Sequence, residues 1–283
     1  MKLPPRPIDS NKATFGNVLN IAGSLNYRGA AFLSSVSALR TGAGYVTLAA
    51  VPPVIDAVAA QLPDAVYIPL PSLGPVLSPA SVQVLTPLVK APTVCAFGCG
   101  ISAIGHPFDD IMGTVFRILE LFIEQNVFFV LDADGLNALS LAKKQFRFEG
   151  RAVLTPHPKE LARLLHTDVS KIQKDRIDAA REASQKFDAV VLLKGFHTVI
   201  ANGNDYRIND TGNSALSKAG SGDVLTGIIA GLLAQKMEPF DAATLGAKIH
   251  GLAGELASAE KTEYGVLASD LPNFIPRAIQ RIQ

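Results

Sequence analysis

Short apolar runs alternate with amphipathic segments along most of the chain, and glycine-containing loops separate them. Apolar runs of this kind predict strands, and apolar residues at helical spacing predict helices. Their regular alternation is typical of βαβ units and a parallel sheet. The predicted strands cover residues 17–22, 45–49, 65–70, 93–97, 127–131, 152–154 and 189–193.

The segments between and after these strands have the pattern of helices. They cover residues 30–39, 53–62, 78–90 (interrupted by Pro87), 108–125, 159–165, 170–186, 224–233, 239–258 and 269–281, with one further helix beginning near Gly135. Residues 198–201 and 206–208 depart from the alternation and predict an antiparallel meander. The strand at 127–131 is wholly apolar, which is typical of the middle of a sheet covered on both faces. We therefore predict a single α/β domain over residues 1–283, with a mostly parallel central sheet and residues 1–14 as an N-terminal extension.

Composition narrows the class of protein. Nearly half of the residues are hydrophobic, and 26 Lys and Arg residues almost balance 25 Asp and Glu residues. This balance argues against nucleic acid or an anionic membrane as the main partner. No signal peptide begins the chain, and no apolar run reaches the ~18 residues of a membrane span. We expect a soluble, cytoplasmic protein in which Cys95 and Cys99 are buried or loop thiols.

Residues 209–233 have the strongest chemical pattern in the chain. A polar loop ends in Ala219-Gly220-Ser221-Gly222-Asp223, and an apolar helix follows. Glycines let the backbone approach a ligand closely, and the first turn of a helix leaves N–H groups free to bind an anion such as phosphate. Asp223 would repel that anion. It is either a residue that caps the helix, or a general base that deprotonates a hydroxyl as the oxygen attacks phosphorus.

Three other loops at strand ends carry polar side chains. Lys194, followed by Gly195 to Thr198, either places a cation near a phosphate or belongs to a plain hairpin turn. His157 lies in a loop stiffened by two prolines and either bonds a ligand or has a structural role. Asp132 and Asp134 follow a central strand and either hold a hydrated magnesium ion indirectly or cap the next helix.

Several standard signatures are absent from the sequence: the phosphate loop of P-loop enzymes, the dinucleotide-binding glycine motif, the nucleophile elbow and zinc-ligand spacing. The glycine pairs around Ala43 and Cys99 permit close approach to a flat ligand, but they also suit ordinary turns. The residues alone therefore predict an α/β enzyme that transfers phosphate, without naming its substrate.

The order of these motifs resembles a known family. The start of the helix at Gly220 is similar to that of ribokinase-like enzymes. Residues 131–138, residues 155–160, Leu193-Lys194-Gly195 with Thr198, and Asn213 together resemble the ADP/ATP-dependent NAD(P)H-hydrate dehydratases. The resemblance runs from Gly23 to about Gly254.

The resemblance implies a repair lyase that returns the S-epimer of hydrated NADH or NADPH to the normal cofactor at the expense of ADP or ATP. It implies that Asp223 deprotonates the ring hydroxyl, that the oxygen attacks the terminal phosphorus, and that phosphate then leaves. The catalytic residues would be Gly220, Ser221, Gly222 and Asp223. The nucleotide would be bound by Lys194, Gly195, Phe196, His197, Thr198 and Gly222, and the hydrate by Ala43, Gly100, His157 and Asp223. Magnesium would be carried by the nucleotide phosphates, with no protein residue as metal ligand.

The sequence also departs from the family pattern. Cys99 stands where many relatives have proline, and no second glycine lies beside Gly23. We expect no fused epimerase domain, so that a separate protein would epimerise the hydrate. The family suggests a homotetramer.

Two alternatives remain. The first is a ribokinase-like kinase for a vitamin precursor, such as a hydroxyethylthiazole, a hydroxymethylpyrimidine or pyridoxal. It would have a similar site but would accumulate a phosphorylated organic product. The second is a nucleotide-sensing module without turnover, which the presence of Asp223 argues against.

Overall fold

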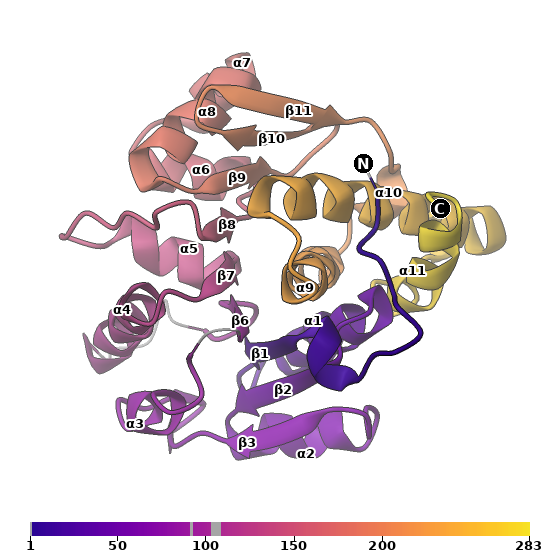
Figure 1. Ribbon diagram of the computed structural model, residues 1–283. Helices are drawn as coiled ribbons and strands as arrows, with labels where there is room; N and C mark the ends of the chain where they lie inside the picture. The colour runs from indigo at the N-terminus through magenta and orange to yellow at the C-terminus, as the bar shows by residue number, and fades with distance from the viewer. Residues whose placement is uncertain (1, 91–92, 103–108) are drawn as a thin grey trace.

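The central sheet is mostly parallel, as predicted. The computed structural model describes residues 2–90, 93–102 and 109–283. The strands of its main sheet are β1 (Asn17–Ile21), β2 (Tyr45–Ala50), β3 (Val66–Pro69), β6 (Val94–Phe97), β7 (Phe128–Leu131), β8 (Ala152–Leu154), β9 (Val190–Leu193), β10 (Thr198–Asn202) and β11 (Asp205–Asn209). Their order is β11-β10-β9-β8-β7-β6-β1-β2-β3 (Figure 1). From β9 to β3 in this order, each strand is parallel to its neighbour. Strand β10 is antiparallel to both β9 and β11, and these last pairings form one edge of the sheet.

Alternate residues of the central strands enter different hydrophobic cores. In β6, Cys95 and Phe97 belong to one core, whereas Val94 and Ala96 belong to the other. Because successive side chains of a strand point to opposite faces, each face needs its own cover of helices. The prediction that the central strands are covered on both faces is confirmed.

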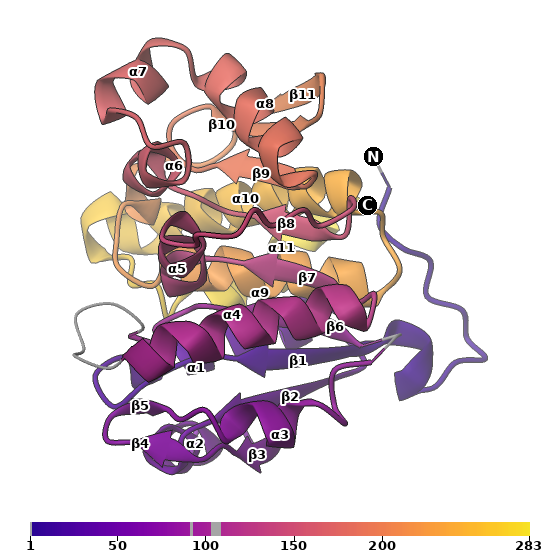
Figure 2. The same cartoon turned by 90° about the vertical axis from the view of Figure 1, so that its left-hand side faces the viewer.

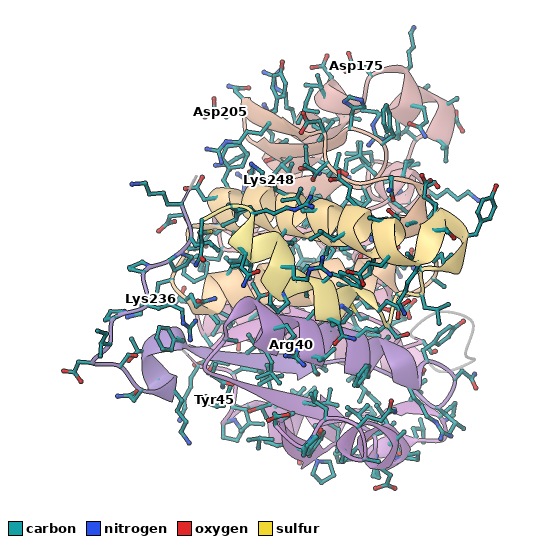
Figure 3. All side chains as sticks on the ribbon, turned by 90° about the vertical axis from the view of Figure 1, so that its right-hand side faces the viewer. Arg40, Tyr45, Asp175, Asp205, Lys236 and Lys248 are labelled. Carbon is teal, nitrogen blue, oxygen red and sulfur yellow. The ribbon has the colours of Figure 1, made fainter. Side chains whose placement is uncertain are left out.

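Helices cover the two faces of the sheet. The first core includes residues of α2 (Pro52–Ala59), α3 (Ser81–Leu85), α4 (Asp109–Glu124), α5 (Ala133–Ser140), α6 (Pro158–Leu164), α7 (Val169–Lys174) and α8 (Arg176–Phe187). The other face is covered by α1 (Arg28–Thr41), α9 (Ser221–Ala234), α10 (Pro239–Gly265) and α11 (Leu271–Gln280). Figure 2 shows α4 and α5 in front of the sheet, and Figure 3 shows the opposite face, with Lys248 labelled on α10 and Arg40 on α1.

Some helix boundaries differ from the prediction. The helix predicted at 170–186 is broken at Asp175, whose side chain accepts a hydrogen bond from the backbone N–H of Asp178 at 2.9 Å and so caps α8. The helix predicted at 78–90 shortens to α3, and α10 runs beyond the predicted end at Ser258, with a kink at Thr262. Phe108, the predicted start of α4, lies outside the described residues. Four short elements were not predicted: β4 (Ser72–Leu73), β5 (Val76–Leu77), η1 (Lys12–Phe15) and η2 (Ser214–Leu216).

The fold gathers the chemistry-bearing loops at one edge of the sheet. Loops that follow parallel strands β6, β7, β8 and β9 emerge together at the carboxyl edge, where open α/β sheets bind ligands. Strand β10 turns back from this edge and β11 returns to it, so that Thr198 pairs with Asn209. The chain then runs from Asn209 into α9, and the start of α9 lies among the same loops.

Cys95 and Cys99 are both buried and unpaired, as expected for thiols of this kind. Among the described residues, no helix has the length and apolar character needed to cross a membrane.

Candidate active site

The start of α9 has the backbone of an anion-binding turn. Gly220 occupies the N-cap position with φ 93°, in the left-handed region that favours glycine. A Cβ atom at this position would lie 2.7 Å from the Leu33 side chain, so a larger residue does not fit. No side chain caps this helix, which leaves Asp223 without the capping role that the sequence also permitted. The Ser221 N–H donates to the Lys218 carbonyl oxygen at 3.2 Å, and the N–H groups of Gly222 and Asp223 remain available to a ligand.

Asp223 is half-buried beside two other polar groups. One carboxylate oxygen of Asp223, one carboxylate oxygen of Asp132 and the Cys99 Sγ all lie within 4.8 Å of one another. Burial, followed by the negative charge of Asp132, raises the pKa of Asp223 to about 6, although the Cys99 thiol and Lys194 oppose the shift. A carboxylate with a pKa near neutrality is suited to accept a proton at physiological pH.

Asp132 connects three elements at this edge of the sheet. Its Oδ1 accepts a hydrogen bond from Lys194 Nζ at 2.7 Å, and its Oδ2 accepts one from Thr226 Oγ1 at 2.9 Å. Burial favours the neutral form of each charged partner, but the ion pair outweighs it: Lys194 holds the pKa of Asp132 below its ordinary value, and Asp132 holds that of Lys194 above its own. Asp132 therefore ties the end of β7 to the end of β9 and to α9.

Of the two predicted roles of the 132–134 loop, Asp132 does not fill the helix-capping one, and indirect binding of hydrated magnesium stays a prediction. Asp132 is at the N-cap position of α5 but makes no side-chain cap hydrogen bond. Both of its oxygens already accept hydrogen bonds from protein groups, which suits it poorly as a direct metal ligand. Asp134 accepts a hydrogen bond from the backbone N–H of Ser102 at 2.8 Å.

His157 caps α6 with its side chain. Its Nδ1 accepts hydrogen bonds from the backbone N–H groups of Lys159 and Glu160, each at 3.1 Å. Burial lowers the pKa of His157, and the charge of Lys194 lowers it further. A neutral ring whose Nδ1 accepts must carry its hydrogen on Nε2, so His157 can donate one hydrogen bond from Nε2.

Glu160 is a further polar group near the site. Its Oε2 accepts a hydrogen bond from the His157 backbone at 2.8 Å and lies 3.9 Å from Lys194 Nζ. Burial is the largest influence on this carboxyl and raises its pKa to about 7, although Lys194 opposes the shift. No chemical role was predicted for Glu160, because a glutamate in the first turn of a helix is ordinary.

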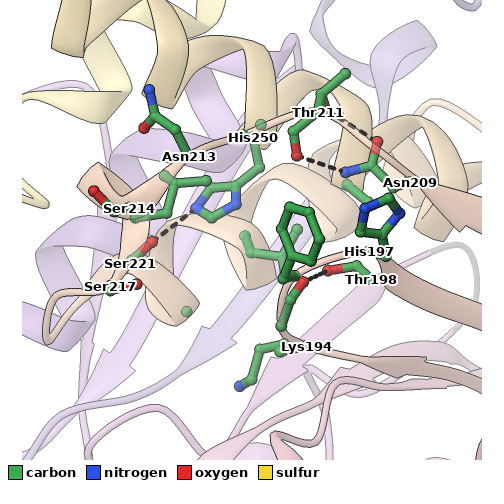
Figure 4. Close-up of a pocket in the computed structure, with 18 of the residues that line it drawn as sticks. Lys194, His197, Thr198, Asn209, Thr211, Asn213, Ser214, Ser217, Ser221 and His250 are labelled. Atoms are coloured by element: carbon green, nitrogen blue, oxygen red, sulfur yellow. Dashed lines mark hydrogen bonds between the residues drawn. The ribbon is translucent and has the colours of Figure 1, made fainter. Parts of the chain in front are cut away.

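A cavity of about 830 Å³ opens in front of these loops (Figure 4). Of the predicted residues, it is lined by His157, Lys194, Gly195, Phe196, His197, Thr198, Ser221 and Gly222. A Cβ atom on Gly222 would lie 3.4 Å from Lys194 Nζ, so the lysine reaches the first turn of α9. Phe196 is 85% exposed at the cavity, with the edge of its ring against His197. Its open face can stack on a flat ligand.

The cavity wall also contains residues that sequence reasoning did not single out. They include Thr211, Lys218 and His250. Asn213, which the sequence analysis used only to recognise the family, lines the same cavity.

The structure does not bring every predicted site residue into this cavity. Asp223 is not part of its wall and lies next to Cys99 instead. Gly100 follows Cys99 and packs against Tyr27 and Ala30 at the start of α1. Ala43 lies just before β2, at the amino end of that strand, and is thus at the opposite edge of the sheet from the other predicted residues. Within one chain, Ala43 is therefore separated from Asp223.

A sequence model of the NAD(P)H-hydrate dehydratase family matches residues 18–277. The chain belongs to this family. Membership accounts for the order of the strand-end motifs, since the match runs from β1 into α11. A ribokinase-like superfamily protein from Enterococcus faecalis superposes with a TM-score of 0.83 at 25% identity over 99% of this chain and 92% of that one, which supports the predicted ribokinase-like fold.

Family members with known names include long and short chains. The chain is 40% identical over 286 aligned residues to a bifunctional NAD(P)H-hydrate repair enzyme from Moorella thermoacetica, covering 100% of this chain and 52% of the relative. It is 33% identical to an ADP-dependent (S)-NAD(P)H-hydrate dehydratase from Bacillus subtilis, covering 99% of this chain and 95% of the relative. The chain thus spans about half the length of the bifunctional relatives that it matches.

A solved structure agrees with this assignment. The ADP/ATP-dependent NAD(P)H-hydrate dehydratase from Bacillus subtilis, co-crystallised with ATP and Mg²⁺, superposes with a TM-score of 0.85 at 31% identity. The superposition covers 100% of this chain and 95% of that one.

Proposed function

We propose that this chain dehydrates the S-epimer of hydrated NADH or NADPH, using ADP or ATP to turn the ring hydroxyl into a leaving group. The enzyme would be a carbon–oxygen lyase. The observation that carries the proposal is Asp223, a half-buried carboxylate with its pKa raised to about 6 in the first turn of α9. Family membership supports the choice of substrate over a vitamin precursor.

The nucleotide would occupy the cavity beside α9. Lys194, Gly195 and Thr198 would hold it, with its terminal phosphate directed at the free N–H groups in the first turn of α9. The helix dipole and the Lys194 ammonium both favour negative charge there. Phe196 would stack on the adenine ring, because its exposed face is open to the cavity.

Magnesium, when bound, would neutralise charge on the transferred phosphoryl group. Asp132 and Glu160 are the carboxylates nearest Lys194, and their bonds to protein donors suit contact through the waters of the ion rather than direct ligation. This arrangement supports a metal carried by the nucleotide phosphates.

Asp223 would take the proton from the ring hydroxyl as its oxygen attacks the terminal phosphorus. The bond from that phosphorus to the departing nucleotide breaks, giving AMP from ADP or ADP from ATP. The C–O bond then breaks with its electron pair leaving on phosphate, and loss of a proton from the neighbouring ring carbon restores the double bond. Backbone N–H groups at the start of α9 would stabilise the developing charge.

The hydrate would bind on the Cys99 side of Asp223. Gly100 and His157 lie at the same edge of the sheet as Asp223, and His157 can donate from Nε2. Ala43 remains a proposed hydrate contact, although it lies at the far edge within one chain. Cys99, which stands where many relatives have proline, adjoins Asp223 on this side.

The test is to incubate the protein with hydrated NADH, magnesium and either ADP or ATP, and to follow the absorbance of the reduced nicotinamide. We expect the absorbance to return only when a nucleotide is present. A parallel incubation with hydroxyethylthiazole, hydroxymethylpyrimidine or pyridoxal in place of hydrated NADH provides the control against a kinase, which would accumulate the phosphorylated precursor in the mass spectrum. Failure to recover NADH with both nucleotides would reject the proposal.

We further propose a cytoplasmic homotetramer that depends on a separate activity to epimerise the other hydrate. Light scattering on the purified chain tests the tetramer. Incubation with the R-epimer alone tests the epimerase requirement, since no NADH should form until an epimerase is added.

A further inference from the structure

His250 lies at the cavity although no sequence motif pointed to it. It belongs to α10, is 9% exposed, and places its Nε2 3.0 Å from Ser221 Oγ (Figure 4). Ser221 is the first residue of α9 and is 5% exposed. Both residues line the cavity. A buried serine–histidine pair thus joins two helices at the proposed anion site.

The packing of α10 explains how a histidine reaches this place. Gly251, the next residue, lies against Thr211, so closely that a Cβ atom on Gly251 would overlap it. The glycine brings the helix backbone against the loop that leads to α9. His250 can therefore bridge to Ser221 without an intervening water.

The ring of His250 is neutral at physiological pH. Burial lowers its pKa to about 4, and a hydrogen bond to the Ser221 backbone opposes this only in part. In the tautomer with its hydrogen on Nε2, the ring nitrogen that faces Ser221 Oγ is a donor. The same N–H can then donate to Ser221 Oγ.

A serine hydroxyl that accepts from a fixed donor keeps its own hydrogen free to donate. Ser221 lies between Gly220 and Gly222 and lines the cavity together with Gly222. A hydroxyl hydrogen directed there would add one more donor to those of the backbone. Donors fixed in advance around developing charge are worth more than donors that must reorient.

We propose that His250 is a positioning residue, which holds the Ser221 hydroxyl so that it donates to the terminal phosphate of the bound adenine nucleotide. The identity of the phosphate rests on the proposed function. The pairing of His250 with Ser221 rests on the geometry of α9 and α10.

A double-mutant cycle tests the pair. Ser221→Ala should lower kcat about 100-fold, as expected for the loss of one donor at an oxyanion site. His250→Leu should lower kcat about 10-fold, since the hydroxyl remains but is no longer held. The double variant should be no slower than Ser221→Ala, because His250 acts through the hydroxyl. If the fold-losses in kcat of the two single variants multiply in the double variant, the proposal is overturned.

A conservative variant separates positioning from simple packing. His250→Gln carries an amide N–H at about the reach of the ring nitrogen and should recover most of the lost rate, whereas His250→Leu only fills space. Equal losses in these two variants would show that Ser221 does not need the donor. His166→Asn changes an exposed histidine that does not line the cavity and is the matched control, with unchanged kcat expected.

The same double-mutant cycle can be measured without catalysis, by calorimetry of ADP binding to each variant. Coupling between Ser221 and His250 in ADP affinity would support the inference even if the protein failed to recover NADH, in which case the proposed function alone would fall. Additive effects in both ADP affinity and rate would reject the inference. If His250→Leu does not fold, as judged by thermal unfolding, His250→Gln against Ser221→Ala completes the comparison.

Discussion

The Asp223 carboxyl is partly buried and lies at the N-terminus of a helix, and these two features have opposite effects on its pKa. The helix dipole favours its negative charge, whereas burial and Asp132 disfavour it, and the second effect wins because the pKa rises to about 6. The residue is thus a carboxylate that can both hold and release a proton near neutrality. This property is needed by a base, and a surface capping residue lacks it.

Replacing Asp223 by asparagine tests this role. Asp223→Asn keeps the size of the side chain but cannot accept the proton, so we expect kcat to fall by about 1,000-fold or more while ADP affinity changes little. Steady-state kinetics and calorimetry measure the two quantities. Unchanged turnover would contradict the assignment of the base.

The rate should depend on pH through the same residue. Because the proton acceptor must be ionised, the rate should rise with pH below about 6 and level off above it. His250, with its pKa lowered to about 4, stays neutral throughout this range and should contribute no second limb. A pH–rate profile at saturating nucleotide measures the limb. A profile that is flat between about pH 5 and 7 would argue against Asp223 as the group that titrates.

Single residues also mark the limit of what the sequence predicts. Asp223 could be singled out because an acid beside a phosphate site is chemically unusual. His250 could not, because a lone histidine among small residues looks like a buried core residue, and Ser221 is 29 positions away. Only the packing of α10 on the loop before α9 brings the two together.

At the scale of elements, Asp132 connects β7 to β9 through an ion pair and to α9 through a hydrogen bond. Asp132 is buried and partnered by both Lys194 and Thr226. Asp132→Asn leaves the Lys194 charge without its main partner, so we expect the protein to lose about 2–4 kcal/mol of unfolding free energy. Urea unfolding measures the loss. Asp132→Asn combined with Lys194→Met should cost less than the sum of the single changes, and additivity would show that the pair does not act as a unit.

The contact between α1 and α9 depends on glycine. A Cβ atom on Gly227 would overlap the Ser34 backbone carbonyl, so Gly227→Ala should destabilise the fold by about 1–3 kcal/mol. Gly113 provides a matched control in α4, since it has no neighbour within 4 Å where a Cβ would be added. Gly113→Ala should stabilise the protein by up to about 1 kcal/mol. Thermal unfolding compares the two, and equal effects would contradict the packing argument.

Most elements could be predicted because each strand is an uninterrupted apolar run between turn residues. The break at Asp175 was missed because an acidic residue on the outer face of a helix has the same pattern as one that caps a new helix. The kink at Thr262 leaves no mark of its own in the sequence. Local pattern therefore located the elements, whereas the boundaries depend on hydrogen bonds that the pattern does not encode.

At the scale of the whole molecule, the cavity wall draws on His157, Lys194, Ser221 and His250, which belong to four different segments. A ligand that binds only this assembled wall stabilises the native state. Adding ADP with magnesium at about 100 times its Kd should contribute ~2.7 kcal/mol and raise the melting temperature by several degrees. Adenosine, which lacks the phosphate, serves as the control and should have a smaller effect at the same concentration. An identical shift with both would indicate that the start of α9 does not bind phosphate.

The contribution of α10 to the cavity also affects when the chain can first bind nucleotide. His250 and Gly251 come late in the sequence, after every strand of the sheet has been synthesised. A nascent chain still lacking α10 has an open wall where the nucleotide would lie. Nucleotide binding to the complete wall therefore requires that α10 has been synthesised and has packed against the loop before α9.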